Sequence, residues 1–164
     1  ECGHTKIGMI GCRGVNQNGD EILDTRMQCF QDSLMKRGLY HPEYTKFGDY
    51  YAKYGYRLLK ELYNERNMPT ALFVANDSMA AGSYRAAYEL GLKIPDDISI
   101  IGFNDIPTAK YMVPPLTTVR LYMEFMGEYA VKLLEERIVR GREICVKVSI
   151  PTKLYVRDSV KTVK

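Results

Sequence analysis

The chain has 164 residues, a formal net charge of +3, 46% hydrophobic residues and 26% charged residues. This composition suits one folded domain with a real core and excludes a disordered chain. No apolar run approaches the length of a membrane span. The basic residues are scattered among acidic ones, which excludes the concentrated positive surface that binds phosphate backbones.

Four cysteines and two histidines show no zinc-ligand spacing, so we expect neither a metal nor a cofactor. Three of the cysteines, Cys12, Cys29 and Cys145, lie beside apolar or strand-like residues, where we expect buried free thiols. The first residues show no signal-peptide pattern. Because free thiols are typical of reducing compartments, we expect a cytoplasmic location.

The first half of the chain alternates short β-rich runs with helical patterns. Strands are expected at residues 6–11, 44–47 and 71–75, and helices at residues 24–37 and 50–66. Asp49 is a candidate N-cap for the second helix. Residues 11–20, rich in glycine and asparagine, are expected to form a loop.

The second half continues the alternation. Helices are expected at residues 77–90 and 123–140, and strands at 98–103, 116–119 and 146–150. Residues 106–115 read as an irregular apolar loop, and the basic residues 153–164 read as a solvated tail. Alternating strands and helices are the signature of an α/β fold with a doubly wound parallel sheet, in which ligands bind at the carboxyl ends of the strands.

Polar side chains follow each expected strand. Amides, carboxylates and an arginine can hydrogen-bond to adjacent hydroxyls, and a tyrosine ring can pack on a sugar or a base, so the set suits a polyhydroxylated small molecule. The alternatives are structural: helix caps for two aspartates, loop-fixing amides, a surface arginine, and a core or interface tyrosine. The residues are Arg26, Asp49, Tyr50, Asn76, Asp77, Asn104 and Asp105.

Enzyme motifs are weak. Gly8, Gly11 and Gly14 do not have the spacing of a dinucleotide-binding loop, and no nucleophile-elbow motif occurs. A Ser-His-Asp set is left open but nothing favours one, because His4 precedes the first strand and His41 has no evident nucleophile partner. We therefore expect a binding protein rather than an enzyme.

Four segments carry a resemblance. They are V-A-N-D-S-M-A-A-G at residues 74–82, G-L-K-I-P-D-D-I-S-I-I-G-F-N-D at 91–105, P-P-L-T-T-V at 114–119, and G-H-T-K-I-G at 3–8. In this order they resemble the lactose- and galactose-repressor family of transcriptional regulators, over nearly the whole chain.

The resemblance implies a two-lobed sensor core of the type I periplasmic-binding-protein shape. Residues 1–164 then form the C-terminal portion of the effector-binding and dimerisation domain, mostly its second lobe, with residues 123–140 packing back into the first lobe. The helix-turn-helix head and the first lobe would lie outside this chain, so operator DNA would be bound only through the absent head.

The resemblance also transfers effector contacts position by position. Cys29 stands where the family has a small glycine, and Asn104 stands where many members have aspartate, so the effector of the best-known members is not assumed. The expected effector-binding residues are Arg26, Tyr50, Asn76, Asn104, Asp105, Leu121 and Met123. The expected homodimer interface comprises Met79, Tyr111, Met112, Val113 and Pro114, the alternative being a loop folded onto its own core.

The implied mechanism is a binding switch in which a small effector, a sugar with galactosides among the candidates, favours one arrangement of the lobes and thereby controls DNA binding. Three rivals remain: a transport-type sugar-binding protein, an enzyme on a doubly wound sheet, and a corepressor sensor that binds a purine.

Overall fold

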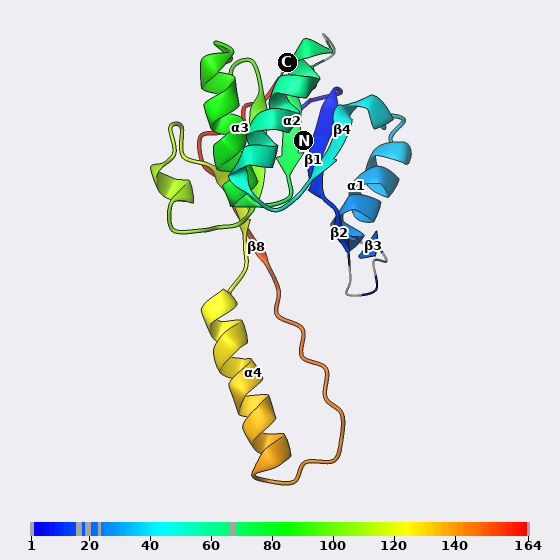
Figure 1. Ribbon diagram of the computed structural model, residues 1–164, viewed down its shortest axis with the longest axis vertical. Helices are drawn as coiled ribbons and strands as arrows, with labels where there is room; N and C mark the ends of the chain where they lie inside the picture. Colours follow the sequence, from blue (N-terminus) through cyan, green and yellow to red (C-terminus); the bar gives the residue numbers. More distant parts are fainter. Residues whose placement is uncertain (1, 16–17, 19–20, 23, 66–67, 164) are drawn as a thin grey trace.

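The computed structural model describes residues 2–15, 18, 21–22, 24–65 and 68–163. Its main element is a six-stranded sheet with the order β4-β1-β5-β6-β7-β8 (Figure 1). The strands are β1 (Ile7–Cys12), β4 (Thr45–Gly48), β5 (Ala71–Val74), β6 (Ser99–Asn104), β7 (Thr117–Arg120) and β8 (Lys153–Tyr155). The α-helices are α1 (Thr25–Met35), α2 (Ala52–Asn64), α3 (Asp77–Glu89) and α4 (Met123–Ile138).

Helices cover both faces of the sheet. The chain moves from β1 to β4 through α1, then reverses direction across the sheet through α2 to β5 and α3 to β6. Because parallel crossovers are right-handed, the reversal places α1 on one face and both α2 and α3 on the other. The five neighbouring strands β4, β1, β5, β6 and β7 run parallel, and β8 runs antiparallel to β7. The expected doubly wound α/β fold is confirmed.

The core lies between the sheet and the α2–α3 layer. Its strand residues include Ile10 and Ile100, both with 0% of their surface exposed, and the inner face of α2 adds three leucines at helical spacing. These leucines are Leu58, Leu59 and Leu62, all buried. The alanine-rich sequence of α3 lets that helix lie close to its neighbours.

Two glycines set the close approach of α2 and α3. A Cβ at Gly55 would overlap the carbonyl group of Met79, and a Cβ at Gly82 would overlap the carbonyl group of Ala52. The two backbones therefore touch at positions where any side chain would force the helices apart.

The segment after α4 differs from the expectation. Residues 146–150 form no strand, although their β-branched residues alternate, and the last strand is β8. The tail is not a solvated extension either. Ser159 is fully buried, and its hydroxyl donates a hydrogen bond of 2.6 Å to the carbonyl of Ile100. The alternation at 146–150 misled because no neighbouring strand is there to pair with it.

Two expected helix caps are also wrong. α2 begins after Tyr51, which makes no side-chain cap, while the carboxylate of Asp49 accepts from the amide of the adjacent Tyr50, outside the helix. α3 is capped by Asn76 instead of Asp77, since the Asn76 side chain accepts from the amide of Met79 at 2.8 Å.

The expected loop after β1 contains a short antiparallel hairpin, β2 (Gly14–Val15) with β3 (Glu21–Ile22). The end of that loop, Asp20, and the expected end of the second helix, Arg66, lie outside the described residues. Among the cysteines, Cys12 is buried as expected, but Cys29 and Cys145 are exposed. Cys29 is exposed although it lies on the sheet-facing side of α1, because it lines an open apolar cavity with Phe30 and Phe73.

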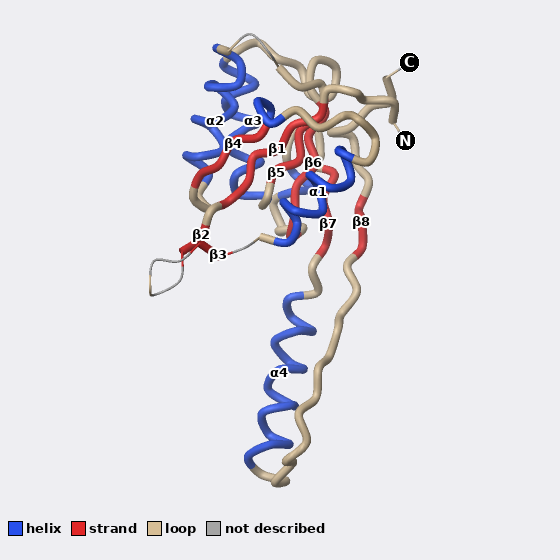
Figure 2. Tube along the Cα trace, turned by 90° about the vertical axis from the view of Figure 1, so that its right-hand side faces the viewer, coloured by secondary structure: helices blue, strands red, loops and turns tan. Residues whose placement is uncertain are grey.

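α4 projects away from the body of the molecule. It leaves from the carboxyl end of β7, and the chain returns beside it to β8 (Figures 1 and 2). No residue of α4 is buried. Among the described residues, no helix combines the length and apolar character needed to cross a membrane.

Candidate functional site

Arg26 joins three elements at the carboxyl edge of the sheet. Its Nη1 donates to the carbonyl of Ala75 at 2.7 Å, and its guanidinium carbon lies 4.6 Å from the centre of the Phe103 ring. Nε and Nη2 donate to the carboxylate of Asp24 at 3.0 and 2.7 Å. Arg26 therefore links the start of α1 to the ends of β5 and β6, and the alternative of a solvated helix-face arginine is wrong.

Asn76 connects the end of β5 with the end of β4. While its Oδ1 caps α3, its Nδ2 donates to the carbonyl of Tyr50 at 3.1 Å and lies 3.8 Å from the sulfur of Cys12. These contacts are the loop-fixing role left open by the sequence. The ring of Tyr50 remains half exposed, at 50%.

The turn after β6 is held in an uncommon conformation. Asn104 has φ = 114° and Asp105 has φ = 56°, and both are non-glycine residues in the left-handed half of backbone space. Such strain persists only where surrounding contacts fix it, and it concentrates at binding sites. Here the carbonyl of Asn104 accepts from the amide of Leu121 at 3.3 Å, which ties the turn to the end of β7.

Two arginines hold the carboxylate of Asp105. Nη2 of Arg157 lies 2.6 Å from Oδ1, and Nε of Arg120 lies 3.9 Å from Oδ2. Arg157 also donates to the carbonyl of Leu116 at 2.6 Å. The shorter of the two contacts of Asp105 is with Arg157, in the segment after β8. A ligand group that approaches Asp105 therefore meets a carboxylate that is already paired.

A cavity of about 300 Å³ opens beside Asp105 at the root of α4. Leu121 and Met123 line it, as expected for pocket residues, and Arg120 contributes the wall on the β7 side. The remaining lining residues are Pro107, Tyr122, Glu124 and Phe125. The cavity therefore combines apolar and aromatic surface with the charged side chains of Asp105, Arg120 and Glu124.

Below this edge lie two buried groups with altered pKa values. Burial raises the pKa of the Asp77 carboxyl, although hydrogen bonds from Thr118 and the Ile106 amide oppose the shift. Burial likewise raises the pKa of the Cys12 thiol to about 11. Both groups are buried, so both belong to the floor of the site.

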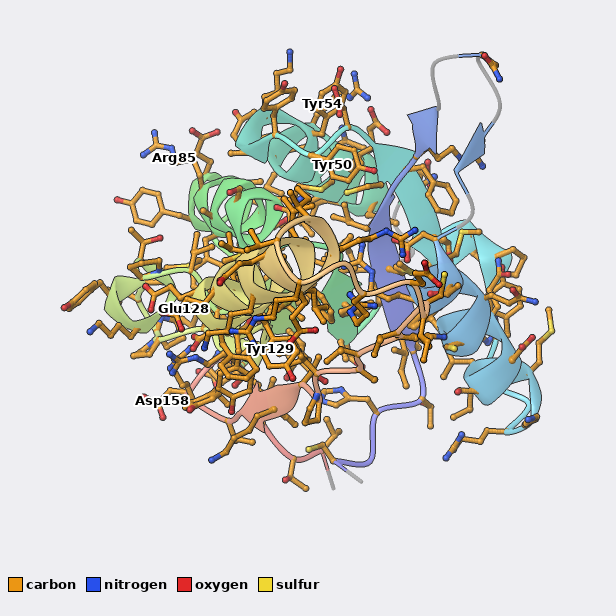
Figure 3. All side chains as sticks on the ribbon, turned by 90° about the horizontal axis from the view of Figure 1, so that it is seen from below. Tyr50, Tyr54, Arg85, Glu128, Tyr129 and Asp158 are labelled. Carbon is orange, nitrogen blue, oxygen red and sulfur yellow. The ribbon has the colours of Figure 1, made fainter. Side chains whose placement is uncertain are left out.

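All seven expected effector-binding residues lie along one edge of the sheet. Arg26, Asn76 and Tyr50 are joined through the ends of β4 and β5. Asn104 ends β6 and is bonded through its carbonyl to Leu121, which lines the cavity beside Asp105. Figure 3, seen from below toward this edge, shows Tyr50 on the α2 side and Glu128 and Tyr129 on α4.

Sequence reasoning missed the groups that hold these residues in place. Asp24 stands two residues before Arg26, a spacing that could have indicated a cap and an ion pair. Arg120 and Arg157 gave no signal, because their partner Asp105 is distant in sequence and residues 153–164 read as solvated.

The expected dimer residues divide into two groups. Tyr111 and Val113 are exposed, at 74% and 89%, and Met112 packs partly on the core. Pro114 accepts a hydrogen bond at its carbonyl from the hydroxyl of Tyr84. Met79 has 0% exposure and is removed from the expected interface, because its side chain is buried in the core with its sulfur 3.2 Å from that of Cys12.

Across the residues the structure describes, no group of three or more histidines, cysteines and acidic residues could hold a metal ion. The hydrogen-bonding groups at the sheet edge can bind and orient a small polar molecule.

Comparison with known proteins matches residues 1–160 to a family described as periplasmic binding protein-like domain. The HTH-type transcriptional regulator GalR of Streptococcus thermophilus is 37% identical over 163 residues, which cover 98% of this chain and 49% of that protein. The chain spans about half the length of the curated relatives of this kind.

Solved structures show the same likeness. A lac repressor dimer bound to operator and an anti-inducer is 28% identical with a TM-score of 0.84, covering 98% of this chain and 54% of that one. A LacI-family regulator from Enterococcus faecium with bound ribose is 27% identical with a TM-score of 0.84, covering 99% and 59%. The chain belongs to the lactose- and galactose-repressor family of transcriptional regulators, of which it carries a periplasmic binding protein-like domain.

Proposed function

We propose that this chain is the C-terminal portion of the effector-binding domain of a sugar-responsive, cytoplasmic transcription repressor. It binds a small sugar, with galactosides among the candidates, and the bound sugar controls operator binding by a DNA-reading head outside this chain. The mechanism is non-covalent, since the effector acts by favouring one arrangement of two lobes over another.

The observation that carries the proposal is that Arg26, Asn76 and Tyr50 meet at the carboxyl edge of a doubly wound sheet, with Asn104 at the end of β6 on the same edge. Ligands bind at this edge in such folds. Donors, amides and an exposed aromatic ring together suit a molecule with several hydroxyl groups and one apolar face. The relative with bound ribose supports a sugar as the ligand class.

The exposed surface of α4 supports the presence of the first lobe, outside this chain, next to the site. Its apolar side chains include Val131, Leu134 and Ile138, which are 66%, 57% and 71% exposed. A helix with this much exposed apolar surface is expected to be covered. We assign the cover to a first lobe, so that the effector is enclosed between the two lobes.

The apolar loop around Tyr111 and Val113 supports a homodimer, because such exposed apolar loops mark contact surfaces. The operator-bound relative is a dimer. Replacing Val113 with Asp should lower the dimer fraction in light scattering. A matched Val156→Asp change, also at an exposed valine, should leave that fraction unaltered.

The first experiment is an NMR titration of this chain with sugars and purines, following the amides of Arg26, Tyr50, Asn76 and Asn104. Shifts confined to these residues with one sugar class would support the proposal and name the effector class. Shifts with purines alone would favour a purine-type corepressor sensor.

Turnover of any sugar or purine in the same samples would favour an enzyme. A transport-type sugar-binding protein is separated from a repressor by the complete protein, because only the repressor binds operator DNA in a sugar-dependent manner. Absence of shifts with every compound would contradict the assigned site.

A further inference from the structure

Asp24 holds Arg26 by three contacts at once. Its Oδ1 accepts from both the amide and Nε of Arg26, at 2.9 and 3.0 Å, and its Oδ2 accepts from Nη2 at 2.7 Å. The Asp24 side chain is 15% exposed and that of Arg26 is 30% exposed. Burial alone would raise the pKa of Asp24, but the hydrogen bonds from Arg26 outweigh it and leave the pKa below its ordinary value.

This bidentate pair decides what Arg26 can offer to a ligand. A guanidinium carries five N–H groups. Among the described residues, two of them donate to Asp24 and one to the carbonyl of Ala75, so two are left, one on each Nη. One face of the guanidinium lies over the Phe103 ring. A ligand therefore meets two fixed donors whose positive charge already has a counterion.

We propose that Asp24 is a positioning residue that sets the charge class of the effector: Arg26 binds an uncharged oxygen, such as a sugar hydroxyl, and discriminates against phosphate or carboxylate groups. This inference rests on the proposed function and refines its site.

The physical reason is that the carboxylate of Asp24 lies directly against the guanidinium of Arg26. An anion on the two remaining donors would share the guanidinium with Asp24, so its attraction to Arg26 would be opposed by repulsion from Asp24. A hydroxyl meets no such opposition, because it needs only directed donors. The fork–fork geometry that makes arginine an anion-binding group is already occupied within the chain.

Other cations lie on the same edge, so the test must read Arg26 itself. Arg120 is paired with Asp105, and Arg13 stacks on Phe47 with its guanidinium carbon 4.3 Å from the ring centre. The Nε–H NMR signal of Arg26 reports that guanidinium alone, and the bond to Asp24 slows its exchange with water.

The first test uses inorganic phosphate as the probe. In the natural chain, millimolar phosphate should leave the Nε–H signal of Arg26 unmoved. Asp24→Asn keeps a good N-cap but removes the counterion, so it should show a saturable shift with affinity at least about tenfold higher, or about 1.4 kcal/mol. Asp24→Glu, which restores the carboxylate, should return toward the natural behaviour.

The control variant is Asp32→Asn, which makes the same charge change on α1 at an exposed position away from Arg26. It should respond like the natural chain. A natural chain whose Arg26 signal saturates with phosphate as tightly as that of Asp24→Asn would overturn the proposal.

The second test compares a neutral sugar that shifts the site with its phosphorylated form. The natural chain should prefer the neutral sugar, and Asp24→Asn should move the ratio of the two affinities toward the phosphorylated form by about tenfold. If Asp24 had a merely structural role, its replacement would lower the affinity for both ligands equally and leave the ratio of the two affinities unchanged. If no sugar binds, the proposed function fails, whereas the phosphate test still decides the role of Asp24.

Discussion

The carboxylate of Asp77 accepts a hydrogen bond of 2.7 Å from the hydroxyl of Thr118, and both residues are fully buried. Asp77 begins α3, the helix that follows β5, and Thr118 lies within β7. Because β6 lies between β5 and β7 in the sheet, the bond passes over β6 to link α3 with β7. The second oxygen of Asp77 accepts from the amide of Ile106 at 2.9 Å, which fixes the loop after β6.

Replacing Asp77 with Ala should destabilise the fold by about 1–3 kcal/mol, because it leaves a buried hydroxyl and a buried amide without an acceptor. Chemical denaturation measures the effect. In a double-mutant cycle with Thr118→Val, the two losses should be less than additive, since each variant removes the same hydrogen bond. Fully additive losses would show that the bond contributes nothing of its own.

Replacing Gly82 with Ala should destabilise the fold by about 1–3 kcal/mol through overpacking, since the new methyl group meets the backbone of α2. The matched change is Gly127→Ala on α4, where an added Cβ meets nothing within 4 Å. There, the higher helix propensity of alanine should stabilise α4 by about 0.5–1 kcal/mol. Equal effects of the two substitutions on thermal unfolding would contradict the close α2–α3 contact.

Glu89 should give the fold a pH-dependent contribution. Hydrogen bonds from Lys60, Tyr56 and Arg85 lower the pKa of Glu89 from 4.5 to about 2. A depressed folded-state pKa stabilises the fold above the unfolded value of 4.5, and that stability is lost as the pH falls through about 2.

The melting temperature of Glu89→Gln should therefore be lower than that of the natural chain at pH 7. The difference between the two melting temperatures should shrink as the pH falls below 4.5. Glu61→Gln serves as the control, because Glu61 forms an exposed pair with Arg57 alone. A difference between the natural chain and Glu89→Gln that stays constant with pH would refute the assignment.

Cys12 should differ from Cys29 and Cys145 in reactivity toward iodoacetamide. Cys12 is 6% exposed and its pKa is raised from 9.0 to about 11, whereas Cys29 and Cys145 are exposed. Because the thiolate is the reacting species, Cys12 should react about a hundredfold more slowly than the exposed thiols at pH 8. Mass spectrometry of timed samples checks the order, and rapid labelling of Cys12 in folded protein would contradict its burial beneath the site.

The sequence predicted those parts of the fold that local patterns determine. β5 and α3 were expected within one or two residues, because a β-rich run ends at an asparagine and a helical period follows. The strand expected at 146–150 failed because alternation records a preference for β-structure but cannot supply a partner strand. β8 escaped notice since its pairing with β7 joins segments more than thirty residues apart, as for Thr118 and Tyr155.

The candidate site was predictable in its positions but not in its contacts. Polar residues after each strand indicated the edge at which Arg26 and Asn76 meet, because parallel strands share that edge. The partners of these side chains are Asp24 for Arg26 and the carbonyl of Tyr50 for Asn76, and Asp105 is likewise bonded by Arg157; only the folded chain brings these groups into place.

The burial of Ser159 also dictates when the fold can be completed during synthesis. Its hydroxyl bonds to Ile100, 59 positions earlier, and accepts from the amide of Thr117, 42 positions earlier. In a nascent chain that ends at α4, β7 therefore has no neighbour at its outer edge. The hydrogen bonds of Ser159 to Ile100 in β6 and Thr117 in β7 are also still missing. Such long-range closure is slow and leaves strand edges open to other chains. Residues 153–159 must leave the ribosome before this edge of the sheet is protected.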